Sequence, residues 1–166
     1  MTDEIIIVGG GIGGLTTALA LAGKGRRTRV LERATEFKPV GAGLQLGPNA
    51  FKVFNALGLT DAVRKHATFP RALVIKDALT AEDLSHIEVA DSVKQRFGYP
   101  YAMMHRADLH AVLLAACRAS ALIALNPGHE LIAFEDAGDH VHVSTKEAQA
   151  NRQDHRASAL MGADGL

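Results

Sequence analysis

Residues 5–14 read IIIVGGGIGG, and this stretch decides the fold class. Residues 5–8 are a short β-branched run that ends in glycine, which is typical of a buried parallel strand. Residues 13–24 carry apolar side chains at helical spacing and end among glycines, so they predict a helix. Residues 28–31 predict a second strand. A strand, a helix and a strand within about 30 residues form a βαβ unit, whose two strands are parallel.

The glycines fit the pattern G-x-G-x-x-G at Gly9, Gly11 and Gly14. The first allows a tight turn out of the strand, the second lets a pyrophosphate approach the backbone, and the third lets the helix pack closely on the strand. The free N–H groups at the start of the helix then face the phosphates. The pattern predicts dinucleotide binding; the alternative is a tight turn without a ligand.

An acidic residue, Glu32, follows the second strand. Its distance from Gly14 is close to the spacing of about 20 residues expected for the carboxylate that binds an adenosine ribose. Arg33 has two interpretations, a residue near the adenosine end of the cofactor or a solvated loop arginine. An arginine there would suit the 2′-phosphate of NADP, but the acid at position 32 opposes that charge. These residues alone leave FAD and NAD open.

The remaining residues predict further elements around an insertion. Residues 33–47 carry no clear period and are expected to form a loop. Helices are expected at 49–57, 60–66 and 106–119, a parallel strand at 122–125, and strands of the insertion at 72–76, 86–90 and 101–104. A β-meander is expected from three later runs, 130–135, 140–145 and 157–161. A polar link at 146–156 would precede the third run.

Composition excludes several functions. The chain has 166 residues, enough for one compact domain, with 18 basic and 18 acidic side chains and no net charge to attract nucleic acid. Because the chain has one cysteine, Cys117, it can form no intrachain disulfide, which favours the cytoplasm. We expect Cys117 to be a small side chain of the core. No stretch approaches the roughly 20 apolar residues of a membrane span. His140 and His142 have no carboxylate cluster beside them, so no metal site is expected there. His105 and His110 flank the start of the helix at 106–119 and are expected to cap it or to be partly buried polar groups.

Separated motifs resemble a known family. They are VGGGIGGL at 8–15, LER at 31–33, GAGLQLGPNA at 41–50, HRADLH at 105–110 and GADGL at 162–166. In this order they resemble the class A flavin-dependent aromatic hydroxylases, and among these the salicylate hydroxylase and 3-hydroxybenzoate 6-hydroxylase branch. The resemblance runs through the whole chain, and it favours FAD as the cofactor.

By this resemblance, the glycine turn would hold the FAD pyrophosphate and Glu32 would hold the adenosine ribose. The resemblance also implies roles for further residues. Gln45 would lie beside the flavin. Arg106 would donate to the FAD phosphate or ribityl region, whereas without the motif it would be a helix-start arginine paired with Asp108. Asp164, in the D-G motif, would lie near the pyrophosphate and the pyridine-nucleotide access; an ordinary turn is the alternative.

Two further residues would approach the substrate by the same resemblance. They are Asn49, otherwise a polar residue at a helix start, and Asp77, otherwise a turn aspartate. The family's downstream G-D motif and its proposed phenol base are not among these residues. No catalytic residue can therefore be named, and we expect the chain to be an incomplete, N-terminal portion of a longer enzyme.

The resemblance implies an α/β fold, a Rossmann-like FAD-binding domain of GR2 type with a β-meander and the start of an inserted substrate-domain sheet. Residues 1–69 and 105–166 would form the FAD-binding domain, and 70–104 the first part of the substrate domain. The implied enzyme is an FAD-dependent monooxygenase that hydroxylates a small, hydroxybenzoate-like aromatic substrate with O₂ and NADH or NADPH, through a flavin C4a-hydroperoxide. A homodimer is one candidate assembly. The alternatives are a GR2-type oxidase or dehydrogenase, or a non-catalytic dinucleotide-binding module.

Overall fold

The computed structural model describes residues 4–37, 41–147 and 152–165. The chain divides into two compact units. Unit 1 comprises Met1–Val40 and His110–Leu166, and unit 2 comprises Gly41–Leu109. None of the helices in the described ranges is long and apolar enough to cross a membrane.

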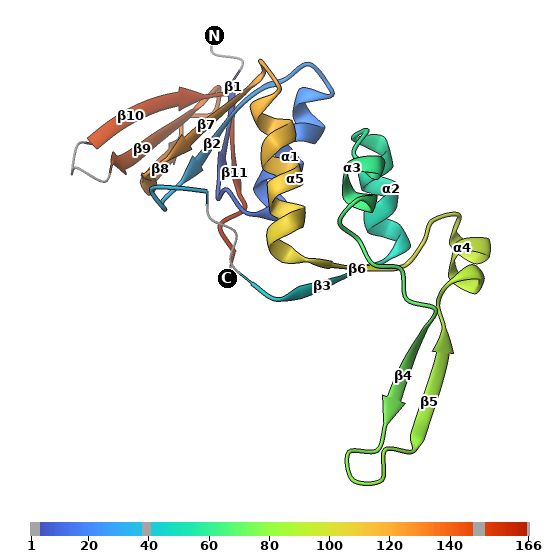
Figure 1. Cartoon of the computed structure of the whole chain (residues 1–166). Coiled ribbons are helices and arrows are strands. Elements are labelled where there is room, and N and C mark those ends of the chain that lie inside the picture. Colours follow the sequence, from blue (N-terminus) through green and yellow to red (C-terminus); the bar gives the residue numbers. More distant parts are fainter. Residues whose placement is uncertain (1–3, 38–40, 148–151, 166) are drawn as a thin grey trace. The chain divides into compact units, whose positions relative to one another are not determined.

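Unit 1 is built on a parallel sheet, as the sequence predicts (Figure 1). Its strand order is β11-β1-β2-β7, and each neighbouring pair is parallel. The strands are β1 (Glu4–Val8), β2 (Arg27–Glu32), β7 (Ile123–Pro127) and β11 (Ala159–Gly162), and the helices are α1 (Ile12–Ala22) and most of α5 (Arg106–Arg118). Four apolar residues of β1 are buried because both faces of the sheet are covered. The predicted βαβ unit is therefore confirmed.

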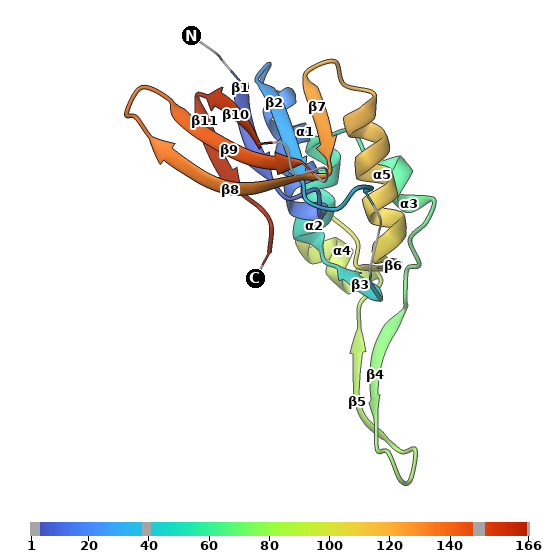
Figure 2. The same ribbon diagram turned by 90° about the vertical axis from the view of Figure 1, so that its left-hand side faces the viewer.

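A three-stranded antiparallel meander covers the face of this sheet opposite to the helices (Figures 1 and 2). It consists of β8 (His129–Asp136), β9 (Val141–Glu147) and β10 (Arg152–Ala157), in the order β10-β9-β8. Its buried Val143 and Ala157 pack with Ile6, Val8 and Leu31 of the parallel sheet. This small apolar layer joins the meander to the sheet.

The prediction for the third meander strand is wrong. Residues 157–161 were expected to complete the meander, but β11 starts at Ala159 and pairs in parallel with β1. The third strand is β10, which lies in the expected polar link. Most of its residues are polar and exposed, so it lacks the apolar alternation that predicts a strand.

Unit 2 contains two antiparallel strand pairs and three short helices. Strand β3 (Gly43–Leu46) pairs with β6 (Ala102–His105), and β4 (Ala72–Lys76) pairs with β5 (Asp83–Glu88). The helices are α2 (Pro48–Ala56), α3 (Thr60–Arg64) and α4 (Asp91–Phe97). The aromatic rings of Phe51 and Phe54 pack edge to face at 5.8 Å between centroids, and both side chains are buried.

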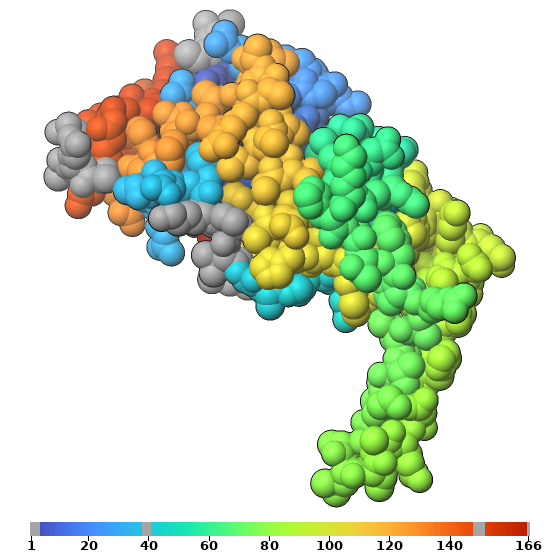
Figure 3. Space-filling model, in the orientation of Figure 1, coloured from blue at the N-terminus to red at the C-terminus, as the bar shows by residue number. Residues whose placement is uncertain are grey.

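Two elements of unit 2 differ from the prediction. Strand β3 lies within the expected loop at 33–47. Its two leucines alternate with Gly43 and Gln45, but four residues among glycines are too short a pattern to predict a strand, which forms by pairing with β6. Helix α4 was not predicted, although Asp91 in its first turn and a left-handed Gly98 at its end are ordinary helix signals. The β4–β5 hairpin carries large apolar side chains that are exposed, among them Leu79, which is 96% exposed. Figure 3 shows the hairpin as the green arm of unit 2.

Candidate functional site

The glycine turn links β1 to α1 in unit 1. Gly9 has a φ of +108°, and its backbone N–H donates to the carbonyl of Leu31 at 2.8 Å. A Cβ at this position would overlap the carbonyl oxygen of Ala163, and the N–H of Ala163 donates to the carbonyl of Val8 at 2.7 Å. The turn is thus held between the ends of β2 and β11, and both its conformation and its neighbours require glycine.

The second and third glycines of the pattern have different surroundings. A Cβ on Gly14 would overlap the carbonyl oxygen of Gly9, so this glycine lets α1 lie against the turn. A Cβ on Gly11 would meet no atom of the described residues within 4 Å, apart from its chain neighbours. Internal packing therefore explains the glycine at position 14, whereas the space beside Gly11 is open to a ligand that approaches the backbone.

Gly10 is held on two sides, although the pattern treats it as variable. Its N–H donates to Oε2 of Glu32 at 2.8 Å, and its carbonyl oxygen lies 2.8 Å from Nε2 of His110. A Cβ on Gly10 would overlap the ring of Phe37. No pattern in the sequence predicts these contacts, since each joins residues that only the tertiary fold brings together.

Glu32 ends β2 and supports the backbone around the turn. Its Oε2 accepts from Gly10, and its Oε1 accepts from the backbone N–H of Ala34 at 2.9 Å. A carboxylate can accept about four hydrogen bonds, so two backbone bonds leave capacity for ribose hydroxyls. Glu32 can therefore fix the turn and bind a ligand at the same time.

Replacing Glu32 with glutamine is expected to weaken FAD binding by about tenfold, the value of one charge-assisted hydrogen bond. In either amide orientation, the NH₂ group faces one of the two backbone N–H donors, of Gly10 or Ala34. Titration of the flavin-free full-length protein with FAD measures the change, and the exposed Glu130→Gln serves as the matched control. Unchanged affinity in Glu32→Gln would contradict the role of the carboxylate.

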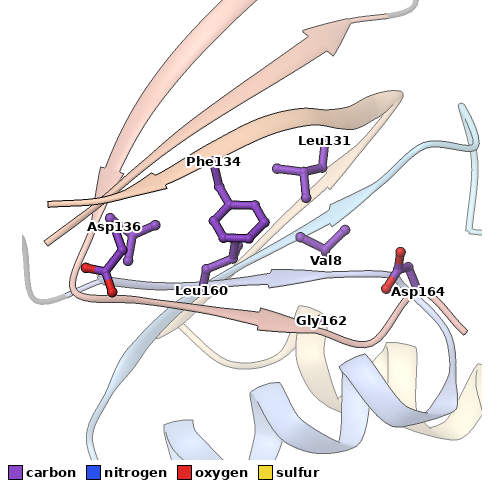
Figure 4. Close-up of a pocket in the computed structure, with 8 residues that line it drawn as sticks. Val8, Leu131, Phe134, Asp136, Leu160, Gly162 and Asp164 are labelled. Carbon is purple, nitrogen blue, oxygen red and sulfur yellow. The ribbon is translucent and has the colours of Figure 1, made fainter. Parts of the chain in front are cut away.

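Asp164 is brought to the glycine turn by β11. A Cβ on Gly9 would lie 2.8 Å from Cα of Asp164, and the following Gly165 has a φ of +86°. Asp164 also lies at one end of a hollow of about 460 Å³ between the meander and the parallel sheet (Figure 4). Leu131, Phe134 and Leu160 make this hollow largely apolar, and Gly11 and Glu32 do not line it. The hollow is therefore distinct from the open space beside Gly11.

Arg33 is exposed in the bend after β2, directly beyond Glu32. The other cationic candidate, Arg106, is the first residue of α5 and lies in unit 2 with Gln45 of β3. The N–H of Arg106 donates to the carbonyl of Ala42 at 3.1 Å, and its side chain packs against Gly41. The pairing of β3 with β6 brings Gln45 and Arg106 into one small region of unit 2.

The two residues predicted to approach a substrate both lie in unit 2. Asn49 is exposed in the first turn of α2. Asp77 accepts hydrogen bonds at 2.8 Å from the backbone N–H groups of Leu79 and Thr80. The bonds from Thr80 and then Leu79 lower the pKa of the Asp77 carboxyl. This is the geometry of a turn aspartate, and a role in substrate binding stays a prediction.

His105, His140 and His142 make local contacts. His140 lies just before β9 and bonds to the adjacent Asp139, and its Nε2 is 2.8 Å from Nε2 of His142. His105 is exposed, and its Nδ1 accepts from the N–H of Ala107 at 3.4 Å, as a helix cap. Within the described residues, no group of three or more histidine, cysteine and acidic side chains could hold a metal ion.

Cys117 is buried in α5, and its sulfur contacts the carbonyl of Leu15 in α1 at 3.5 Å. Burial raises the pKa of the thiol to about 12. We expect iodoacetamide at pH 8 to alkylate Cys117 about a thousandfold more slowly in the native than in the unfolded protein, because the thiolate is the nucleophile. Peptide mass spectrometry measures this rate, with the protein in denaturant as the control. Equal rates would show that the thiol is accessible.

The arrangement of unit 1 fits the adenosine diphosphate half of a dinucleotide. Among the described residues, no atom beyond the chain neighbours lies within 4 Å of a Cβ built on Gly11, and this space lies at the start of α1, where N–H groups favour an anion. Glu32 accepts a hydrogen bond from the N–H of Gly10 and ends β2, where the carboxylate that binds a ribose is expected. Flavin and nicotinamide dinucleotides share this half, so the geometry alone does not choose between them.

Comparison with known proteins makes that choice. A family model described as "FAD binding domain" matches residues 2–166. 3-Hydroxybenzoate 6-hydroxylase 1 of Aquipseudomonas alcaligenes is 37% identical over 166 residues, which are 100% of this chain and 41% of the relative. The 3-hydroxybenzoate 6-hydroxylase of Polaromonas naphthalenivorans (strain CJ2) is 38% identical over 98% of this chain and 40% of the relative. The chain thus spans about two fifths of these curated relatives.

Solved structures share the fold. p-Nitrophenol 4-monooxygenase PnpA from Pseudomonas putida DLL-E4 superposes with a TM-score of 0.89 at 23% identity, over 99% of this chain and 41% of that one. Aklavinone-11 hydroxylase, in a ternary complex with FAD and aklavinone, gives a TM-score of 0.85 at 26% identity, over 98% of this chain and 33% of that one. The Rossmann-like fold expected from the sequence is therefore confirmed.

Proposed function

Because the chain belongs to the FAD binding domain family, we propose that it is part of an FAD-dependent aromatic monooxygenase. The proposed enzyme hydroxylates a small, hydroxybenzoate-like substrate with NADH or NADPH and O₂. One observation carries the proposal: the chain aligns along its whole length with 3-hydroxybenzoate 6-hydroxylase 1 at 37% identity. The glycine turn and Glu32 support it with a site suited to the adenosine diphosphate half of FAD.

In this proposal each residue of unit 1 acts through binding and orientation. Gly11 leaves room for the pyrophosphate beside the start of α1, while Gly9 and Gly14 shape the turn. Glu32 accepts hydrogen bonds from the adenosine ribose, and Asp164 lies at the turn near the pyrophosphate. Arg33 is assigned to the adenosine end. Bound FAD supplies the redox chemistry with the nicotinamide and O₂, which amino-acid side chains do not provide.

The residues of unit 2 would serve the flavin and the substrate. Gln45 is assigned to the flavin ring, and Arg106 to the phosphate or ribityl region, where a planar guanidinium suits several acceptors. Asn49 and Asp77 are assigned to the substrate side. These four assignments rest on the resemblance of the motifs, and alanine substitution with separate measurement of FAD affinity and substrate KM tests each of them.

We also propose that residues 1–69 and 105–166 belong to the FAD-binding domain and that residues 70–104 form the first part of the substrate domain. The exposed apolar side chains of the β4–β5 hairpin, such as Leu79, support it, because the first strands of a larger sheet would leave such a surface uncovered. We further propose that the enzyme is cytoplasmic and forms a homodimer. Size-exclusion chromatography with light scattering tests the homodimer.

Purification of the full-length protein tests the proposed function. We expect a yellow protein with one FAD per chain, and NADH or NADPH oxidation that a hydroxybenzoate stimulates. Absorbance at the flavin bands and at the nicotinamide band measures both properties in one cuvette. A colourless protein that binds no added FAD would contradict the assignment of the cofactor. A yellow protein that no small aromatic compound stimulates would contradict the substrate class.

A further inference from the structure

His110 lies in α5, within unit 1, and the residue is only 7% exposed. Its Nε2 lies 2.8 Å from the carbonyl oxygen of Gly10, in the middle of the glycine turn. A carbonyl oxygen only accepts, so Nε2 carries the proton and donates this hydrogen bond. Nδ1 of His110 is buried and has no hydrogen-bond partner among the described residues. The bond to Gly10 is therefore the polar contact that orients the ring.

The geometry of the peptide group connects this bond to the open space beside Gly11. The structure has no cis peptide among the described residues, and in a planar trans peptide the C=O and the following N–H point in opposite directions. The carbonyl of Gly10 points to the buried His110. The N–H of Gly11 in the same peptide group therefore points away from α5. It makes no hydrogen bond to another described residue.

Glu32 restrains the other side of Gly10. Its carboxylate accepts the N–H of Gly10 at 2.8 Å, while His110 donates to the carbonyl of the same residue. Glycine is the residue most able to rotate its peptide groups, so a glycine turn without such contacts would have several backbone conformations. Fixing both polar groups of Gly10 selects one of them before a ligand binds.

We infer that His110 is a positioning residue for the pyrophosphate site: it holds the Gly10–Gly11 peptide so that the N–H of Gly11 faces a bound diphosphate. His110 does not contact the ligand in this account and acts through the backbone of the turn. The inference rests on the proposed FAD site. It predicts that His110 matters for the diphosphate of the cofactor and not for the adenosine.

Three substitutions in the full-length protein separate the hydrogen bond from the packing of the side chain. His110→Phe keeps a ring and removes the donor, His110→Gln keeps an amide donor at similar reach, and His110→Asn keeps an amide that is too short. ADP and adenosine are the probes, each measured by competition with FAD on the flavin-free protein. Thermal unfolding of each variant reports on the fold, and the exposed His66→Phe is the matched control.

We expect His110→Phe and His110→Asn to bind ADP about tenfold more weakly or worse, the effect of one buried hydrogen bond. Adenosine affinity should stay within about threefold of the wild type, and His110→Gln should recover most of the ADP affinity. If His110→Phe does not fold, the comparison of Asn with Gln decides the question. Equal losses for ADP and adenosine, or wild-type ADP affinity in the Asn variant, would overturn the inference. Failure of the wild type to bind FAD would instead overturn the proposed function.

Discussion

Gly14→Ala is expected to destabilise the protein by about 3 kcal/mol or more, which is the upper range for overpacking a tight site. The added methyl group would overlap the carbonyl oxygen of Gly9, a backbone atom held within the turn. Neither α1 nor β1 can move away without breaking the close contact between helix and sheet. Thermal and denaturant unfolding of the flavin-free full-length protein measures the change, and failure to fold would be the extreme form of the same result.

The neighbouring Gly13→Ala is a matched control for this prediction. Gly13 is exposed in α1, and a Cβ there would meet no atom within 4 Å. Alanine is favoured over glycine in a helix by about 1 kcal/mol, so this variant is expected to be as stable as the wild type or slightly more so. If Gly14→Ala were as stable as Gly13→Ala, the close packing of α1 on the turn would be wrong.

Gly11→Ala is expected to keep the fold and to lose FAD affinity by about 100-fold or more. The added methyl group would meet no atom within 4 Å among the described residues beyond its chain neighbours. Gly11 is the N-cap of α1, where alanine costs up to about 1 kcal/mol relative to glycine, so the flavin-free protein should unfold within a few degrees of the wild type. In the complex the same methyl group would occupy the space proposed for the pyrophosphate. Loss of one or two charge-assisted hydrogen bonds at 1.5–3 kcal/mol each gives roughly this change in affinity.

The control for Gly11→Ala is Gly23→Ala at the other end of α1. Gly23 has a helical φ of −62°, and a Cβ there would make only ordinary contacts at 3.5 Å. FAD titration of both variants, together with their unfolding temperatures, separates binding from stability. Wild-type FAD affinity in Gly11→Ala would show that the pyrophosphate does not lie beside this residue.

The sequence predicted the parts of the fold that depend on local pattern. The β-branched run at 5–8 and the glycines after it determine β1, the turn and α1, because their chemistry is local. Strand β10 has polar side chains on a solvated meander, and β3 becomes a strand only by pairing with β6. Strand β10 carries no apolar period, and the two leucines of β3 alternate over only four residues among glycines, so the local sequence did not distinguish either strand from a loop.

In the candidate site, too, the sequence predicted local features but not the contacts that the tertiary fold creates. The spacing of Glu32 from the glycines predicted its place at the end of β2, but not that both of its oxygens accept backbone N–H groups. His110 approaches Gly10 from a helix 100 residues later in the chain, and this contact exists only in the folded unit. Sequence motifs therefore located the turn, and tertiary structure was needed to find what holds it.

The origin of the oxygen atom in the product tests the central claim most directly. The full-length enzyme, supplied with NADH or NADPH and a hydroxybenzoate substrate under ¹⁸O₂, is analysed by mass spectrometry of the product. A monooxygenase incorporates one ¹⁸O atom into the aromatic ring for each turnover, and this is the result that we predict. An oxidised product without ¹⁸O would contradict the account and indicate an oxidase or dehydrogenase built on the same FAD-binding fold.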